Sequence, residues 1–260
     1  MLSARGLFEE ILDNDESFQL FCSIAASGEA QGGWENGRIA ALVPEGMRDL
    51  APKIARHGAD EDKHGRIFHA LLKRRGLPPV DIPPATDYTM LLEQRGIGLP
   101  HDKLRRNTPL TEQDVVVYLS HSRVTEQRAA DQMEMLVGHF GDHPLVGNAV
   151  KIISADEDNH LAYCHEELLR LARLGHGRTI HRVLQESARA EVRIYRDVSF
   201  AVMDRMGRIL GWPRPKSALL KAGIAGLYGM ERAGGWRRMV SLSMPERRDA
   251  LGGPATAAAF

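Results

Sequence analysis

The chain has 260 residues, and its 34 Lys plus Arg balance 34 Asp plus Glu, so the formal net charge is zero. Hydrophobic residues make up 43% and charged residues 26%, which is typical of globular proteins and excludes a disordered chain, a collagen-like chain or a coiled-coil rod. Proteins that bind nucleic acid usually carry a basic excess, which this chain lacks. The composition gives no strong sign of a nucleic-acid partner.

The cysteine content and the lengths of the apolar runs limit which cellular compartment and which kinds of metal site can be expected. Cys22 and Cys164 are the two cysteines, which excludes a disulfide scaffold, a Cys-based zinc site and a rubredoxin-type module. The N-terminal segment carries acidic residues where a signal peptide would be apolar, and no run reaches the ~18 apolar residues of a membrane span. We expect a cytoplasmic protein without a transmembrane segment, in which any metal site uses His and carboxylate ligands.

Apolar periodicity and helix-breaking residues predict an all-α protein. In chain order, the expected helices span about residues 15–43, 44–76, 88–95, 111–141, 144–175, 178–211 and 216–233. Thr111 is expected to cap the fourth of these, Pro144 to open the fifth, and Gly175 to end it. A loose tail is expected over about residues 251–260.

The expected helices over about residues 15–43, 44–76, 111–141 and 144–175 have about 30 residues each and would each be ~45 Å long. Short turns join them into two hairpins, and a long proline-rich crossover joins the hairpins, which is typical of a ferritin-like four-helix bundle. We expect a single domain over residues 1–260. The bundle would occupy about residues 15–175, and a helical extension of about two helices would occupy about residues 176–250.

Two nearly identical hexapeptides stand in this pattern. Residues 59–64 read Ala-Asp-Glu-Asp-Lys-His, and residues 155–160 read Ala-Asp-Glu-Asp-Asn-His. Each contains Glu-x-x-His, whose two side chains lie on one face of a helix. One such motif is expected by chance in a chain of this composition, but a hexapeptide that recurs with a single change indicates a duplicated site.

Each hexapeptide is preceded by a glutamate on the helix before it. Glu29 lies 32 residues before Glu61, and Glu126 lies 31 residues before Glu157. Both are followed by small residues. Each hairpin therefore carries one glutamate on its first helix and a Glu-x-x-His motif on its second.

Together the hairpins supply four carboxylates and two imidazoles: Glu29, Glu61, His64, Glu126, Glu157 and His160. Hard oxygen ligands with two imidazoles suit iron or manganese. Six such side chains in a bundle core would be very costly unless metal or mutual pairing neutralised them. The sequence therefore predicts a site for two metal ions.

This duplicated pattern resembles the ferritin-like di-iron carboxylate superfamily, which includes bacterioferritin, rubrerythrin, the ribonucleotide reductase small subunit, bacterial multicomponent monooxygenases, aldehyde-deformylating oxygenase and p-aminobenzoate N-oxygenase. The resemblance covers about residues 15–175. It implies that the six residues are metal ligands for two Fe ions or a Mn/Fe pair. It also implies that Asp60 hydrogen-bonds His160 and that Asp156 hydrogen-bonds His64, which would fix the tautomer of each imidazole.

Several residues near the predicted site have more than one possible role. Glu35 and Glu134 are rivals of the two first-helix glutamates, but their distances to the hexapeptide glutamates, 26 and 23 residues, are unequal. His57 lies one turn before the first hexapeptide glutamate, and a hydrogen-bonded core histidine is favoured over a seventh ligand. For Glu186 and Glu191, a solvated helix face is favoured over an extra ligand.

Two further features can be interpreted in more than one way. Gly28, Gly32 and Gly33 are unusual within a helix, where glycine costs about 1 kcal/mol relative to alanine, and they serve either close helix packing or space beside the metals. Residues 218–240 are mildly amphipathic, and packing against the bundle or a dimer partner is favoured over contact with a membrane surface.

Three functions fit these features. The C-terminal extension, which a storage cage does not need, favours an oxygenase or oxidase that activates O₂ and acts on a small organic substrate. Residues 156–160 with the following Glu166-Glu167-Leu168-Leu169 are similar to the matching helix of aldehyde-deformylating oxygenase. Such an enzyme needs an external electron donor, such as a reductase or ferredoxin, and a homodimer is compatible with it. The second function is that of a ferroxidase or peroxide-reducing protein like bacterioferritin or rubrerythrin, and the third is that of a non-enzymatic ferritin-like scaffold.

Overall fold

The computed structural model describes residues 3–242, and all regular secondary structure in this range is helical, which confirms the all-α class. The long helices are α2 (Asp15–Leu42), α3 (Ala51–Arg74), α6 (Glu112–Phe140), α7 (Gly147–Leu171), α8 (Gly177–Ile209) and α9 (Arg214–Met230). The short helices are α1 (Ala4–Asp13), α4 (Tyr88–Gln94), α5 (His101–Arg105) and α10 (Arg237–Val240). The predicted tail over residues 251–260 lies outside the described residues.

Side-chain caps explain where the helices begin. The Asn14 side chain accepts a hydrogen bond from the Ser17 backbone N–H at the start of α2. Thr111 caps α6 as predicted. It forms a capping box in which the Thr111 side chain accepts a hydrogen bond from the Asp114 backbone N–H, and the Asp114 carboxylate accepts one from the Thr111 backbone N–H. A helix over residues 4–13 was not predicted, and Ser3 caps it.

Two breaks interrupt the predicted helical stretches. The expected helix 44–76 begins with a 3₁₀ segment, η1 (Glu45–Leu50), because Met47 has the non-helical angles φ −128° and ψ 22°. Between α7 and α8 the chain forms a π-helical turn, η3 (Ala172–His176), in which Gly175 has a φ of +102°. Glycine adopts this left-handed conformation without the penalty that a Cβ brings. The helical path therefore breaks at Gly175, as predicted, although α7 itself ends at Leu171.

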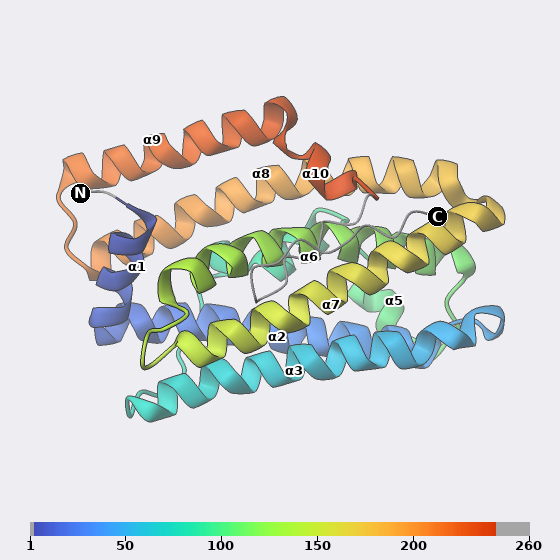
Figure 1. Ribbon diagram of the computed structural model, residues 1–260, viewed down its shortest axis with the longest axis horizontal. Helices are drawn as coiled ribbons and strands as arrows, with labels where there is room; N and C mark the ends of the chain where they lie inside the picture. Colours follow the sequence, from blue (N-terminus) through green and yellow to red (C-terminus); the bar gives the residue numbers. More distant parts are fainter. Residues whose placement is uncertain (1–2, 243–260) are drawn as a thin grey trace, which may run out of the picture.

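The long helices pack as two hairpins, with α8 added beside α6 and α9 beside α8 (Figure 1). Helices α2 and α3 form one hairpin, α6 and α7 form a second, and α3 also contacts α7. Helix α8 packs on α6, and α9 packs on α8. In Figure 1, α9 forms one edge of the molecule and α3 the opposite edge, with α6, α7 and α8 between them.

Two apolar clusters lie at different levels along the hairpins. One includes Leu42, Ile54 and Leu168, and the other includes Phe18 and Phe140. In α2, α3, α6 and α7 alike, the six predicted ligand residues fall between the segments that contribute to these clusters. The polar site is therefore enclosed by packed side chains at both ends.

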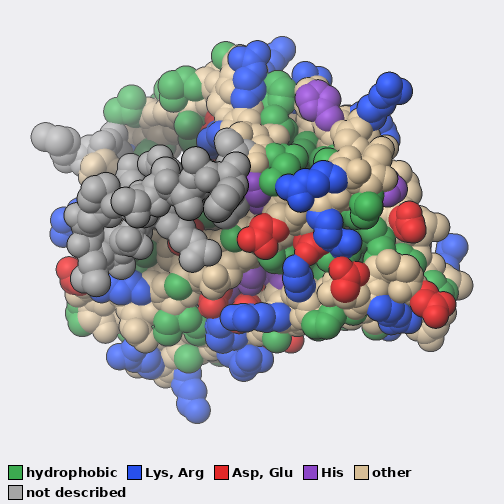
Figure 2. Space-filling model, turned by 45° about the vertical axis from the view of Figure 1, so that its right-hand side comes forward, with side chains coloured by type: hydrophobic (Ala, Val, Ile, Leu, Met, Phe, Trp, Pro, Cys, Tyr) green, Lys and Arg blue, Asp and Glu red, His purple; other side chains and the backbone are tan. Residues whose placement is uncertain are grey.

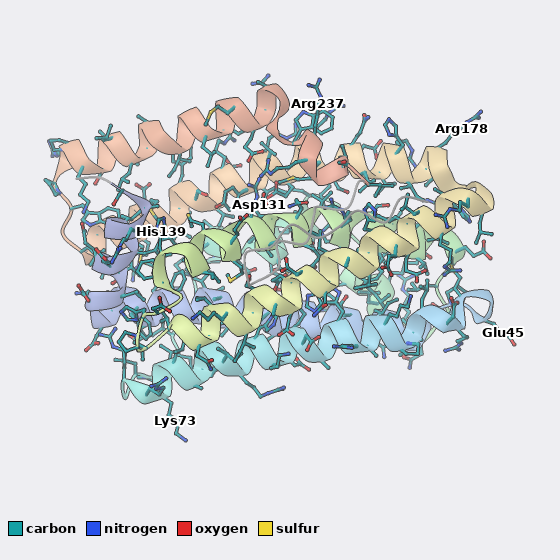
Figure 3. The ribbon with its side chains drawn as sticks, viewed as in Figure 1. Glu45, Lys73, Asp131, His139, Arg178 and Arg237 are labelled. Carbon is teal, nitrogen blue, oxygen red and sulfur yellow. The ribbon has the colours of Figure 1, made fainter. Side chains whose placement is uncertain are left out.

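Charged side chains of both signs lie on the surface of the molecule (Figure 2). Figure 2 shows basic and acidic side chains interspersed over the face displayed, in keeping with the zero net charge. Glu45, Lys73 and Arg178 extend outward near the ends of the hairpins and of α8 (Figure 3). None of the helices in residues 3–242 is both long enough and apolar enough to cross a membrane.

Candidate metal centre

The six residues singled out by the repeat converge between the two hairpins. His64 Nδ1 lies 3.4 Å from Glu29 Oε2 and 3.5 Å from Glu157 Oε1. His160 Nδ1 lies 3.5 Å from both Glu61 Oε1 and Glu126 Oε2. Each imidazole therefore faces carboxylates from its own hairpin and from the other one. The carboxylate–histidine cluster is defined as these six residues together with His57.

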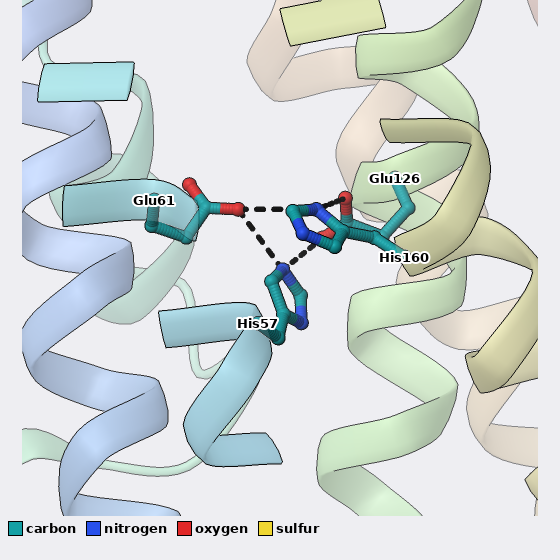
Figure 4. A group of neighbouring side chains, drawn as sticks. All are labelled: His57, Glu61, Glu126 and His160. Carbon is teal, nitrogen blue, oxygen red and sulfur yellow. Dashed lines mark hydrogen bonds and ion pairs between the residues drawn. The ribbon is translucent and has the colours of Figure 1, made fainter. Parts of the chain in front are cut away.

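The cluster contains two overlapping groups of ligand atoms. His57, Glu61, Glu126 and His160 can each offer an atom within 4.8 Å of the others, as Figure 4 illustrates. Glu29, Glu61 and His64 form a second such group. Glu61 belongs to both groups. Glu157 lies between the imidazoles, with Oε1 3.5 Å from His64 Nδ1 and Oε2 3.9 Å from His160 Nδ1.

His57 is a buried, hydrogen-bonded histidine, as favoured from the sequence, and it also faces the carboxylates of the cluster. Its Nε2 lies 2.9 Å from Glu61 Oε1 and 3.3 Å from Glu126 Oε1, and its ring is tilted over that of His160 with centroids 3.9 Å apart. The signal was its position one turn before Glu61 on the same helix face. Ile153 occupies the matching position before the second hexapeptide, so the second motif has no counterpart of His57.

The two aspartates of the hexapeptides lie behind the imidazoles of the opposite hairpin. Asp156 Oδ2 is 3.0 Å from His64 Nε2, a hydrogen bond, whereas Asp60 Oδ2 is 3.5 Å from His160 Nε2. Lys63 joins them, with Nζ 2.6 Å from Asp60 and 2.7 Å from Asp156. A carboxylate that accepts the Nε2–H of His64 leaves Nδ1 free as an acceptor toward the cluster.

Crowding of like charges perturbs the titration of the cluster. Burial, reinforced by neighbouring carboxylates, raises the pKa of Glu29 to about 7 and those of Glu61 and Glu157 to about 8. Burial also opposes ionisation of Glu126, but His57 and His160 outweigh it and hold the pKa of Glu126 well below its usual range. The cluster therefore requires compensating positive charge, from protons or from metal cations.

Some buried atoms of the cluster have no hydrogen-bond partner among the described residues. They are His64 Nδ1, His160 Nδ1, His160 Nε2 and Glu157 Oε2. Buried polar atoms in proteins almost always have a partner. Both Nδ1 atoms face carboxylates across the cluster, so lone pairs and negative charge converge there. This donor set of carboxylate oxygens and imidazole nitrogens fits iron or manganese.

A cavity of about 600 Å³ adjoins the cluster, whose Glu29, Glu61 and Glu126 form part of its wall. Most of the remaining wall is apolar. It includes Phe8, Phe21, Leu136, Val198 and Val202, which belong to α1, α2, α6 and α8. A volume of this size is in the usual range for small-molecule sites, and the lining favours an apolar molecule.

Glu191 was expected on a solvated face, and this expectation is wrong. Its side chain is fully buried and accepts hydrogen bonds of 2.8 and 2.9 Å from the guanidinium of Arg128, with a third from the Tyr88 hydroxyl. Burying the Arg128 guanidinium requires a paired carboxylate, which α8 supplies. Glu191 is thus engaged away from the cluster.

Three more glutamates, Glu35, Glu134 and Glu186, contribute no ligand atom to the cluster. Glu35 accepts a hydrogen bond of 2.6 Å from His101, and Glu134 is exposed on α6. Glu186 is exposed and pairs with Arg182 at 3.1 Å, which confirms the solvated face expected for it.

The glycines of α2 serve both purposes considered for them. A Cβ on Gly32 would lie 3.3 Å from Glu61 Oε2, so its absence leaves room for this carboxylate. A Cβ on Gly33 would collide with the Asp62 carboxylate and lie 3.2 Å from the Gly58 carbonyl oxygen. Gly33 and Gly58 therefore allow α2 and α3 to approach closely, which brings Glu29 to the partners on α3.

Comparison of the chain with protein-family models, with curated proteins and with solved structures finds no match.

Proposed function

We propose that α2, α3, α6 and α7 form a ferritin-like bundle around two metal ions, and that the protein is a di-iron or Mn/Fe oxidoreductase that activates O₂ and acts on an organic molecule. One observation carries this proposal: four helices bring four carboxylates and three imidazoles into one buried cluster, where ligand atoms lack hydrogen-bond partners among the described residues. Neutralising such a cluster is the role that a pair of divalent cations fills in carboxylate-rich bundles.

The two groups of ligand atoms indicate which residues would hold each metal ion. Glu29 and His64 would hold one ion; Glu126, His160 and His57 would hold the other; Glu61 and Glu157 lie where they can reach both. When bound, a pair of ferrous ions supplies electrons for the reduction of O₂. The protein supplies a fixed, enclosed arrangement of ligands.

Neighbouring residues hold the imidazoles in place. Asp156 accepts the Nε2–H of His64 and so directs Nδ1 inward. The Tyr163 hydroxyl lies 3.0 Å from His57 Nδ1, which leaves Nε2 facing Glu61, and it also hydrogen-bonds the Tyr118 hydroxyl at 2.7 Å. The apolar clusters flank the site on both sides.

The cavity favours oxidation of an organic molecule over iron storage. A ferroxidase needs a polar path for hydrated ferrous ions, whereas the wall beside Glu29 and Glu126 is largely apolar. An apolar substrate could lie there with one of its carbons facing the cluster. An electron donor, such as a reductase or ferredoxin, and a second copy of the chain are further partners that we propose.

The test is the metal content after anaerobic loading with ferrous iron and desalting. We expect about two irons per chain, as in the carboxylate bundles. A Glu61→Ala/Glu157→Ala double variant should lose both, and Glu186→Ala, which removes an exposed carboxylate, should retain them. Near-zero iron in the folded wild type would overturn the proposal, and a large iron excess per assembly after exposure to air would indicate storage instead.

A further inference from the structure

A second pocket, of about 260 Å³, lies where α8, α9 and the π-helical turn η4 (Glu231–Gly235) meet. We call it the arginine pocket. Its lining residues are Arg189, Val192, Arg193, Tyr228, Arg232 and Trp236. Half of them are arginines and none is acidic, so positive charge converges on a concave surface.

The three arginines of the pocket have no carboxylate partner within residues 3–242. Arg189, Arg193 and Arg232 are exposed, and no ion pair joins any of them to the described residues. Glu231, the acidic residue next to Arg232, is already engaged: its Oε1 lies 3.3 Å from Arg128 Nη1 and its Oε2 2.6 Å from Arg238 Nη1. The guanidinium groups of the pocket are therefore available to an external anion, which they match with several N–H donors each.

An aromatic side chain holds part of the pocket in place. The guanidinium of Arg189 lies over the Trp236 ring, 4.8 Å from its centroid, and this cation–π contact restricts the long side chain. A side chain that is ordered before binding loses less entropy when it binds a ligand.

The arginine pocket adjoins the apolar cavity. Val192 and Tyr228 line both, and the cavity wall runs on to Glu29, Glu61 and Glu126 of the carboxylate–histidine cluster. A molecule that fills both spaces would have an anionic group at one end and an apolar chain extending toward the cluster.

The surrounding helices carry a local charge excess. Residues 177–240 contain 13 Lys or Arg and 5 Asp or Glu, although the whole chain is neutral. Such an excess raises the local concentration of anions and speeds their association. It is concentrated in α8, α9 and the segment after them, the elements that form the arginine pocket.

We propose that the arginine pocket binds the carboxylate or phosphate of an amphiphilic substrate whose apolar chain lies in the cavity beside the cluster. The inference rests on the proposed function, since it names the substrate class for the same centre. Arg189 and Arg193 donate hydrogen bonds to the anionic group, and the apolar wall takes up the chain.

The test is isothermal titration of the full chain with four probes, all below micelle-forming concentrations: dodecanoate, dodecyl phosphate, dodecanol and inorganic phosphate. We expect saturable binding of one or both anionic amphiphiles, at least tenfold tighter than that of dodecanol or inorganic phosphate. The preferred head group identifies the anion. Equal affinity for dodecanol would overturn the role of the arginines, and equal affinity for inorganic phosphate would overturn the role of the chain.

Matched variants locate the site. Arg193→Gln and Arg189→Gln should each lower the affinity for the tighter-binding anionic probe at least tenfold, while the affinity for dodecanol stays unchanged. Arg208→Gln removes an exposed arginine of the same helix outside the pocket and should leave every affinity unchanged. Equal effects of Arg193→Gln and Arg208→Gln would refute the assignment.

Iron content of the same proteins separates this inference from the proposed function. If the protein holds about two irons per chain but shows no preference for the anionic probes, the arginine pocket is refuted and the proposed metal centre is not. Selective, arginine-dependent binding in a chain that holds no iron supports the pocket and refutes the metal centre.

Discussion

Replacing Gly58 by alanine tests the close contact that brings α2 and α3 together. A Cβ at Gly58 would lie 3.0 Å from Asn36 Cβ, 3.1 Å from the Gly33 carbonyl oxygen and 3.2 Å from the Gly37 backbone nitrogen. Two of these are backbone atoms, so the strain can be relieved only by moving α2 away from α3. Overpacking of this kind costs ~3 kcal/mol at the upper end, and the higher helix propensity of alanine returns ~1 kcal/mol. The expected net loss is about 2 kcal/mol.

The measurement is urea unfolding followed by circular dichroism, with Gly37→Ala as the matched control. A Cβ at Gly37 meets nothing within 4 Å, so alanine there should stabilise the protein by ~0.5–1 kcal/mol. The Gly58 variant should also bind less iron, because moving α2 displaces Glu29. If Gly58→Ala is as stable as the wild type, the reasoning about close packing is wrong.

Three further predictions concern single side chains. His57→Ala should lower metal affinity at least tenfold, measured by equilibrium dialysis, while saturating metal still gives the wild-type stoichiometry; unchanged affinity would show that His57 neither binds nor orients metal. Glu191→Gln should cost about 2–3 kcal/mol in urea unfolding, because Arg128 stays buried with one charged partner; a loss below ~1 kcal/mol would contradict this. Burial would raise the pKa of Glu167, but hydrogen bonds from Lys53 and Arg170 outweigh it and lower the pKa. The stabilisation is then present above the ordinary pKa of glutamate and lost as the pH falls through the lowered value, so Glu167→Gln should cost ~1 kcal/mol at neutral pH and nothing in acid.

Much of the helical framework could be predicted because its causes are local. Thr111 is followed at the third position by Asp114, which completes a capping box within four residues. Gly175 ends a helix because a backbone with φ of +102° excludes most other residues. The 3₁₀ start before α3 was missed because the angles at Met47 depend on how the turn packs.

Part of the candidate site could likewise be predicted from local sequence, and part depends on tertiary packing. Helix periodicity places Glu61 with His64, and Glu157 with His160, on one face each, and the repeat marks both faces as special. The same periodicity places His57 on that face, but the lack of a counterpart before the second hexapeptide gave no reason to include it. Whether His57 on α3 comes close to Glu126 on α6 depends on how the two helices pack.

The sequence by itself determined the all-α class and most helix ends, and it singled out six candidate ligands, because periodicity, capping and an internal repeat are visible within short segments. Only the tertiary structure decided the pairing of Arg128 with Glu191, 63 residues apart, and the position of the arginine pocket beside the cavity. These depend on which helix faces meet. Which helix faces meet depends on the combined packing of segments that are far apart in the sequence, and a local sequence pattern does not contain this information.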